Sequence, residues 1–320
     1  MSTASYKTIQ ALEQVVKPLP VGTNLALLHL MWAMLRGAFL KGRGAVHTAL
    51  SESGFSDGEI RRSWQALRYG TWDIRELIAR WRHLVLSEKQ WATREYEGWR
   101  PLAVDITAFW RPQLRFWSNK FFHRLANRLI KGVGFGVITQ IGEVNGQRMP
   151  LLKRIIRADP NDDGETELKA TILRQVPLYL DEQEVFVHDA GVSITEVQDA
   201  KIARFVIRLA VNCTGRRNYL PSKKKRGRPA EYGRLVRPLP RKRGDNHIPA
   251  TAPDTTVSFQ FGDRTIEAQG WTGLVRTGQK VSATNETFTV WVFHDPLYKK
   301  PLVLGTNLSA QAETIFRLYL

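Results

Sequence analysis

The chain is poor in cysteine and lacks any long apolar run. Its single cysteine, Cys213, cannot close a disulfide within the chain or share a zinc ion with a second cysteine, which favours a reducing cytoplasmic setting. The most apolar stretch, residues 25–35, contains His29 and is far shorter than the roughly 20 residues that cross a bilayer. The first residues lack the charged-then-apolar order of a secretory signal. We therefore expect no membrane partner.

Positive charge is abundant and unevenly distributed. The formal net charge is +17, and the window 216–243 holds twelve Lys and Arg against one acid, Glu231. Such an excess predicts attraction to a polyanion, nucleic acid before an anionic membrane surface. A solvated loop whose lysines only aid solubility is the alternative for a charge run of this kind.

Residues 1–95 have a helical pattern, and we expect them to form an all-α domain. Apolar residues recur at helical spacing in 25–35, a short helix is expected over 45–50, and Ser56-Asp-Gly-Glu59 matches a capping box that starts a new helix. A further helix is expected from Asp73 to about Leu86, with Ile74, Leu77, Ile78 and Trp81 on one stripe.

The helix that begins after Ser56 has two chemically different faces. Ile60, Trp64 and Leu67 share the apolar face, and the opposite face is polar and basic, comprising Arg61, Arg62, Gln65 and Arg68. A short helix, a Gly-containing turn and a capped helix follow one another, which is the layout of a helix-turn-helix. The second helix of such a motif could lie in a major groove. A helical bundle with a solvated arginine face fits the same pattern.

From residue 96 the pattern changes to alternating strands and helices, and we expect a second domain over 96–320. Two segments, 101–109 and 184–191, each place one aspartate, Asp105 or Asp189, at the end of an apolar, β-branched run, where we expect a strand to end. If these strands lie side by side, the two aspartates could share a divalent cation. The alternative is that both are ordinary strand-end or turn aspartates.

The rest of the second domain supplies a hairpin, an aromatic segment and a β-rich region. Asn145-Gly146 is a strong two-residue hairpin signal. Residues 109–131 interleave aromatics with six Lys and Arg and contain no acid, which suits either a nucleic-acid surface or a core with snorkelling arginines. We expect a basic loop and β-rich insertion over about 214–287, and a last strand over 301–308 followed by a helix.

In this order the chain resembles a DDE-type insertion-sequence transposase. The segments that carry the resemblance are Val104-Asp-Ile-Thr-Ala-Phe-Trp110, 120–128, Lys131-Gly-Val-Gly-Phe-Gly136, Val187-His-Asp-Ala-Gly191 and Pro301-Leu-Val-Leu-Gly-Thr-Asn307. The resemblance implies an α/β fold, an RNase H-like mixed sheet with a β-rich insertion behind an all-α helix-turn-helix-like domain. It implies metal-dependent phosphodiester cleavage and strand transfer at a site that binds two Mg²⁺ (or Mn²⁺) ions, with Asp105 and Asp189 as its first two catalytic, metal-binding carboxylates. It also implies double-stranded DNA and a homo-oligomer on that DNA as partners, and a bacterial, nucleoid-associated location.

The resemblance also implies a third catalytic carboxylate, a Glu on the helix after the last strand, beyond a Tyr and an Arg. Tyr319 matches the Tyr, but the sequence ends at Leu320, before the Arg and the Glu, and Glu313 lies six residues before Tyr319. The chain therefore resembles a transposase cut before its third carboxylate. The alternative function is a non-catalytic DNA-binding protein that inhibits or regulates transposition; an RNA-binding protein, which charge alone would suggest, is disfavoured by the paired aspartates.

A last motif lies in the basic loop. Its Arg-Gly-Arg-Pro core is similar to an AT-hook, which lays arginines into a narrow A·T minor groove. The residues expected to contact DNA there are Lys224, Lys225, Arg226 and Arg228. Alternatively, Gly and Pro only keep a phosphate-binding loop extended.

Overall fold

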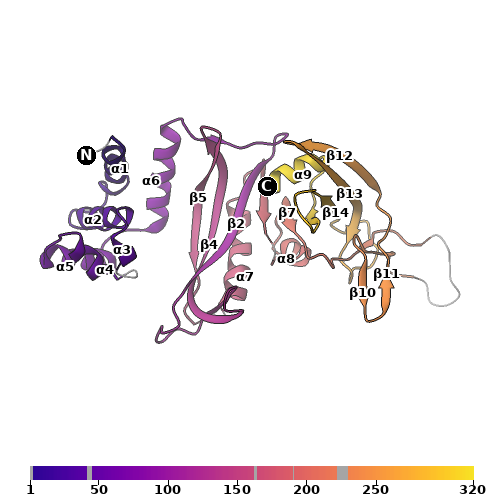
Figure 1. Ribbon diagram of the computed structural model, residues 1–320, viewed down its shortest axis with the longest axis horizontal. Helices are drawn as coiled ribbons and strands as arrows, with labels where there is room; N and C mark the ends of the chain where they lie inside the picture. The colour runs from indigo at the N-terminus through magenta and orange to yellow at the C-terminus, as the bar shows by residue number, and fades with distance from the viewer. Residues whose placement is uncertain (1–2, 42–44, 162–163, 190, 222–229) are drawn as a thin grey trace. The chain divides into compact units, whose positions relative to one another are not determined.

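The computed structural model describes residues 3–41, 45–161, 164–189, 191–221 and 230–320 (Figure 1). The chain forms two compact units, one comprising Met1–Ala92 with Val144–Arg154 and the other Thr93–Glu143 with Ile155–Leu320. The tip of the hairpin, which the sequence pattern assigned to the second domain, thus groups with the helices. In the described part of the chain, no helix combines the length and apolarity needed to cross a membrane.

The first unit consists of helices packed around two small apolar clusters. One cluster joins α1, α2 and α6, and the other joins α2, α4 and α5. The helices are α1 (Thr3–Val16), α2 (Thr23–Leu35), α3 (Ala38–Lys41), α4 (Val46–Glu52), α5 (Asp57–Tyr69) and α6 (Ile74–Ser87).

The two predicted helix starts in this unit are confirmed. The Ser56 backbone N–H and hydroxyl both donate to Glu59 Oε2, at 2.8 and 2.7 Å, and α5 begins at the next residue. These bonds lower the pKa of Glu59. At α6 the Asp73 side chain accepts from the Arg75 backbone N–H at 2.6 Å. Capping therefore fixes both helices locally, since each side chain bonds a backbone group that the helix leaves unpaired.

Three aromatic and aliphatic positions in these helices depart from the predicted inner faces. On α5 the buried residues are Ile60, Ser63 and Ala66, so Trp64 lies to one side of that face and is exposed. On α6, Ile74 and Trp81 are also exposed, whereas Leu77, Ile78 and Leu84 are buried. The small residues Ser63 and Ala66 allow close helix packing, and tertiary contacts rather than hydrophobicity decide which side chains are covered.

The second unit is mixed α/β with a large, mostly antiparallel sheet. Among the described residues the sheet runs in the order β1-β4-β2-β6-β7-β15-β14-β13-β8-β9, with β3 and β5 pairing β4 and β12 pairing β13. The strands are β1 (Ala92–Thr93), β2 (Arg100–Trp110), β3 (Lys120–His123), β4 (Arg128–Val144), β5 (Gln147–Arg157), β6 (Glu184–His188), β7 (Phe205–Arg208), β8 (Gly215–Arg217), β9 (Leu235–Val236), β12 (Thr255–Phe261), β13 (Arg264–Val275), β14 (Phe288–His294) and β15 (Leu302–Thr306).

Short helices and a small ribbon complete this unit. The predicted insertion, 214–287, contains β8 to β13, including the separate pair β10 (Arg241–Arg243) and β11 (Asn246–Ile248). The helical segments are α7 (Glu165–Gln175), η1 (Val176–Leu178), α8 (Ile194–Asp199) and α9 (Ala312–Tyr319). The predicted hairpin turn is confirmed: Asn145 and Gly146 have φ of 52° and 75°, the left-handed values of a type I′ turn.

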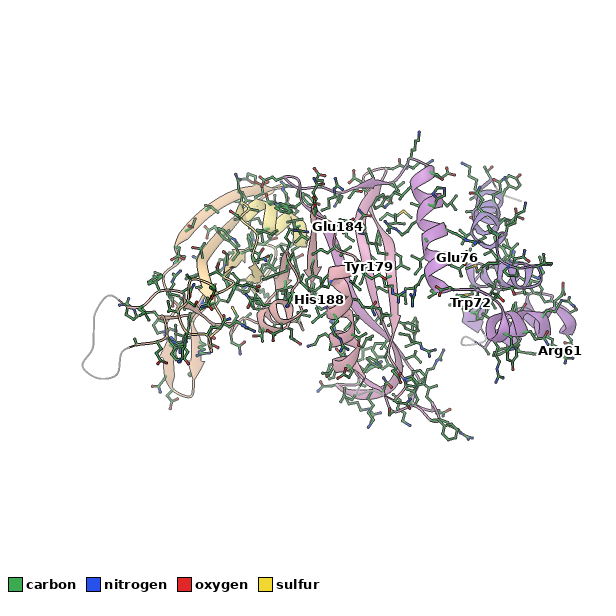
Figure 2. All side chains as sticks on the ribbon, turned by 180° about the vertical axis from the view of Figure 1, so that it is seen from behind. Arg61, Trp72, Glu76, Tyr179, Glu184 and His188 are labelled. Carbon is green, nitrogen blue, oxygen red and sulfur yellow. The ribbon has the colours of Figure 1, made fainter. Side chains whose placement is uncertain are left out.

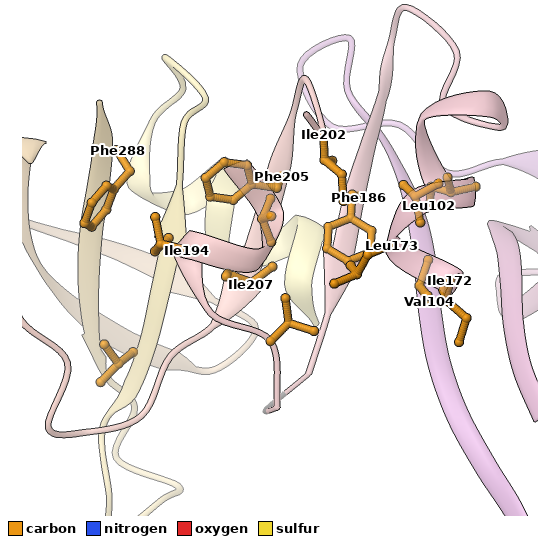
Figure 3. Packing of buried hydrophobic residues seen from close by; sticks show 14 of the residues in the cluster. Leu102, Val104, Ile172, Leu173, Phe186, Ile194, Ile202, Phe205, Ile207 and Phe288 are labelled. Carbon is orange, nitrogen blue, oxygen red and sulfur yellow. The ribbon is translucent and has the colours of Figure 1, made fainter. Parts of the chain in front are cut away.

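Helices cover both faces of the central strands. Every residue of β6 is buried, as expected for a parallel strand covered on both sides. Side chains alternate along a strand, so Phe186 packs with Leu102, Val104 and the residues of α7 and α8 (Figure 3), whereas Val185 packs with those of α9.

A glycine on β4 sets how closely α7 approaches the sheet. A Cβ built on Gly136 would lie 1.9 Å from Ile172 Cδ1, an impossible distance. Ile172 is buried on α7, so the absent side chain at Gly136 makes room for it. The contact fixes α7 against β4, and β4 in turn pairs antiparallel with β2, the strand that carries Asp105.

Candidate active site at the carboxyl ends of parallel strands

Three neighbouring parallel strands place charged residues side by side. β2, β6 and β7 are paired in parallel, with Val104 opposite His188 and His188 opposite Ile207. The residue that follows each of these positions is Asp105, Asp189 or Arg208. The two aspartates predicted from sequence therefore lie at the same end of adjacent strands, where open α/β sheets bind ligands.

The structure corrects one detail of the prediction. Asp105 was expected at the end of its strand, but β2 continues to Trp110 and remains paired with β4 as far as Gly132. Only the other edge of β2 opens at Asp105, because β6 ends at His188. Asp105 is therefore exposed on the side of β2 where β6 has ended, while β4 remains paired with β2 on the other side.

Both aspartates line one cavity of about 600 Å³. Its wall also carries three basic side chains, Lys120, Arg124 and Lys169. The remaining lining residues are Ile106, Ser118, Leu129, Glu165, Thr166, His188 and Gly191. Carboxylates that face a basic rim are an arrangement in which a cation and a phosphodiester can bind together.

Asp189 is held by two side chains from other elements. Arg208 Nη1 lies 3.2 Å from Asp189 Oδ1, and the Tyr319 hydroxyl donates to the same oxygen at 2.7 Å. Burial and this hydrogen bond raise the pKa of Tyr319 well above its ordinary value, so its hydroxyl stays protonated and remains a donor. α9 therefore fixes the carboxylate of Asp189 from the far end of the chain.

His188 (Figure 2) directly precedes Asp189 at the end of β6, opposite Val104, and is buried. Its Nδ1 is 2.6 Å from the Asp189 carbonyl oxygen, and since a carbonyl only accepts, Nδ1 carries the proton and Nε2 is the acceptor. Burial lowers the pKa of His188, which keeps the ring neutral. His188 therefore braces the turn that carries Asp189 without adding charge to the cavity.

The donor chemistry fits a magnesium-like ion. Asp105 and Asp189 offer carboxylate oxygens, and Mg²⁺ typically takes one or two carboxylates and completes its shell with water and substrate phosphate. Within the described ranges, no group of three or more His, Cys, Asp or Glu side chains is arranged to hold a metal ion. Glu313 therefore forms no such group with the two aspartates, and its Oε1 lies 2.7 Å from Arg317 Nη2.

A second candidate surface lies in the first unit, on α5. Arg61 (Figure 2), Arg62, Gln65 and Arg68 are all exposed along the helix, as their spacing predicted. α4 precedes α5, and the turn between them contains Gly54 at φ 84°. Exposed Trp64 adds a ring to this side of the helix. The loop residues Lys224, Lys225, Arg226 and Arg228 lie outside the described residues.

Sequence reasoning missed several residues around the aspartates. The apolar pattern predicts a strand over 205–212, but β7 ends at Arg208, so the terminal position of Arg208 was not visible from the pattern. Glu165 and Lys169 come from α7, and no local pattern ties them to Asp105. Arg208 could have been found by aligning the ends of consecutive parallel strands.

Comparison with known proteins adds no relative: neither the protein-family models nor the curated proteins contain a match to this chain.

Proposed function

We propose that this chain is a DDE-type insertion-sequence transposase, which binds DNA and carries out metal-dependent phosphodiester cleavage and strand transfer. The observation that carries the proposal is the placement of Asp105 and Asp189 at the same end of adjacent parallel strands, in one cavity with a basic rim. Two carboxylates so placed suit metal-assisted attack on a phosphodiester.

The topology supports the finer fold assignment, an RNase H-like domain. The hairpin strands β5 and β4 precede the central β2 in the sheet order, and β6 and β7 follow it in parallel. Helix α7 links the hairpin to β6, and the β-rich insertion separates β7 from β15. This is the strand order that the resemblance implies, with one aspartate on the central strand and one after its parallel neighbour.

The proposed mechanism assigns a task to each side chain around the cavity. Asp105 and Asp189 would hold Mg²⁺ or Mn²⁺, which would supply Lewis-acid activation of a water or 3′-hydroxyl nucleophile and stabilisation of negative charge on the leaving oxygen. Arg208 and Tyr319 fix the orientation of Asp189, as outer partners of metal ligands do. Lys120 and Arg124 bind the phosphate that enters the cavity.

DNA binding is common to this proposal and to the alternative. The exposed basic face of α5 supports a major-groove contact, with the arginines on phosphates or guanines and Gln65 on adenine. A non-catalytic regulator of transposition needs this surface and not the aspartate pair. We propose double-stranded DNA as the partner and assembly of several copies on it.

The test measures duplex binding and cleavage by the full chain. The association constant for a random-sequence duplex should fall as the salt concentration rises. A plot of its logarithm against the logarithm of the salt concentration should have a slope of about −0.9 for each phosphate neutralised. Mn²⁺-dependent nicking of the same DNA should disappear in Asp105→Asn and Asp189→Asn. The control is Asp199→Asn: Asp199 is 63% exposed and paired with Arg276, much as Asp189 is 58% exposed and paired with Arg208.

The outcomes separate the two functions. Salt-sensitive binding with nicking that depends on both aspartates supports the transposase. Binding without nicking in the unaltered chain supports the non-catalytic DNA-binding protein, and affinity that is independent of salt rejects both.

A further inference from the structure

The loop between β2 and β3 exposes an aromatic ring at a strained backbone position. Phe116 is 99% exposed, and its φ is 54°, in the left-handed region that non-glycine residues rarely adopt. Phenylalanine is normally among the most buried residues. An exposed ring on an unfavourable backbone conformation contributes nothing to folding, so it points to a role in binding.

The loop that carries Phe116 is firmly attached to its surroundings. Before Phe116 in the sequence, the Arg111 backbone N–H donates to Lys131 O at 2.8 Å. After Phe116, Trp117 Nε1 donates to Gly132 O at 2.7 Å, and Ser118 Oγ donates to Pro160 O at 2.8 Å. Phe116 is therefore a fixed projection from an anchored base.

More apolar side chains are exposed close by in the sequence. Leu125 is 95% exposed in the turn between β3 and β4, and Phe122 and Leu129 on those strands are also exposed. We call the segment 111–129, which contains Phe116 and these three residues, the aromatic arm. The arm also forms part of the candidate active site, because Ser118, Lys120, Arg124 and Leu129 line the cavity of the aspartates.

Charge identifies what the arm binds. From residue 106 to residue 142 the chain has six Lys and Arg and no acidic residue. Arg115, next to the ring, is exposed, as is Arg124, next to Leu125. A second copy of a chain with net charge +17 would be repelled by such a surface, whereas a nucleic acid offers phosphates for the cations and bases for the ring.

We propose that Phe116 is a base-unstacking wedge. DNA lies with its backbone on the cations of the aromatic arm, and the Phe116 ring inserts against a base step beside the phosphate that enters the aspartate cavity. Apolar wedges of this kind separate neighbouring bases and kink the duplex. The inference rests on the proposed function, because it takes duplex DNA as the ligand.

The experiment uses the full chain and a DNA duplex with thymines distributed along it. Permanganate oxidises thymines that are unstacked, so its reaction reports the wedge directly. The chain should raise the reactivity of thymines at its binding site, and Phe116→Ala should lower that signal about five- to a hundredfold, the equivalent of one base–aromatic stack. Phe116→Trp should retain it.

The control is Leu178→Ala, which removes another exposed apolar side chain, 79% exposed, outside the arm. It should leave the thymine signal unchanged. All variants are compared at saturating protein, with affinity measured separately by fluorescence anisotropy.

Two results would overturn the inference while leaving the proposed function in place. One is equal thymine reactivity with Phe116→Ala and the unaltered chain, both bound to DNA. The other is a change in the DNA-free mass of Phe116→Ala by light scattering, which would place the ring in a contact between copies of the chain. Failure of the unaltered chain to bind DNA would instead reject the proposed function.

Discussion

The basic face of α5 and the aspartate cavity present charged residues in different ways. On α5, Arg61, Gln65 and Arg68 recur at helical spacing and project from one exposed side. In the cavity, Asp105 and Asp189 are 84 positions apart in the chain and meet only because β2 pairs with β6. The first surface depends on local structure, and the second depends on the whole sheet.

The largest expected effect concerns DNA recognition by α5. Replacing Arg61, Gln65 and Arg68 with alanine should reduce preference for a sequence selected from random duplexes, since each lost bidentate base contact removes about 1–3 kcal/mol of discrimination. Arg241→Ala with Lys242→Ala removes two cations from β10 as the control, and should weaken binding to all sequences alike. Uniform loss in the α5 variant would mean that its side chains contact only phosphates.

A pair of glycine substitutions separates local from long-range support. Gly136→Ala forces a methyl group against buried Ile172 and should lower the free energy of unfolding by about 1–3 kcal/mol. The methyl group added by Gly54→Ala meets no atom within 4 Å. This variant should lose roughly 1–2 kcal/mol of unfolding free energy, only because alanine is strained at a φ of 84°. Hydrogen exchange should show faster opening of α7 in the first variant and of α5 in the second. Faster exchange in both units with either variant would contradict the division.

A smaller effect is expected from Tyr319→Phe, which removes the hydroxyl that donates to Asp189. Loss of such an outer hydrogen bond should weaken Mn²⁺ binding about tenfold and leave the fold intact. Tyr298→Phe, at an exposed tyrosine away from Asp189, should change nothing. Unaltered Mn²⁺ affinity in Tyr319→Phe would show that Asp189 is held without α9.

The smallest expected effect is a pH dependence of the capping boxes of α5 and α8. Hydrogen bonds from Ser56 lower the pKa of Glu59; at Glu196 burial opposes this, but bonds from Lys169 and Ser193 lower the pKa overall. A lowered folded pKa means stability that is present above the ordinary value of 4.5 and is lost as pH falls through the folded value. Glu59→Gln and Glu196→Gln should each reduce the decrease in melting temperature that the unaltered chain shows between neutral and acid pH.

Features set by adjacent residues could be predicted from the sequence, whereas features set by packing between distant segments could not. The start of α5 after Ser56 and the turn at Asn145-Gly146 are encoded by adjacent residues and were found correctly. The exposure of Trp64 was not, since burial on α5 depends on which neighbours pack against Ser63 and Ala66. Hydrophobicity alone does not carry that information.

The candidate site was predicted in part for a related reason. Asp105 and Asp189 were singled out because each follows an apolar run, which is a local signal. Arg208 and Glu165 were not, because their place beside the aspartates comes from strand register and from the packing of α7. That register follows from contacts between distant segments, which one sequence does not display.

If Asp105 and Asp189 share one divalent cation, as we propose, titration calorimetry with Mn²⁺ should detect a site that needs both carboxylates. The unaltered chain and Asp199→Asn should bind Mn²⁺ with the same affinity, and Asp105→Asn and Asp189→Asn should each lose that binding. Retention of Mn²⁺ affinity by either of the last two variants would contradict a shared site.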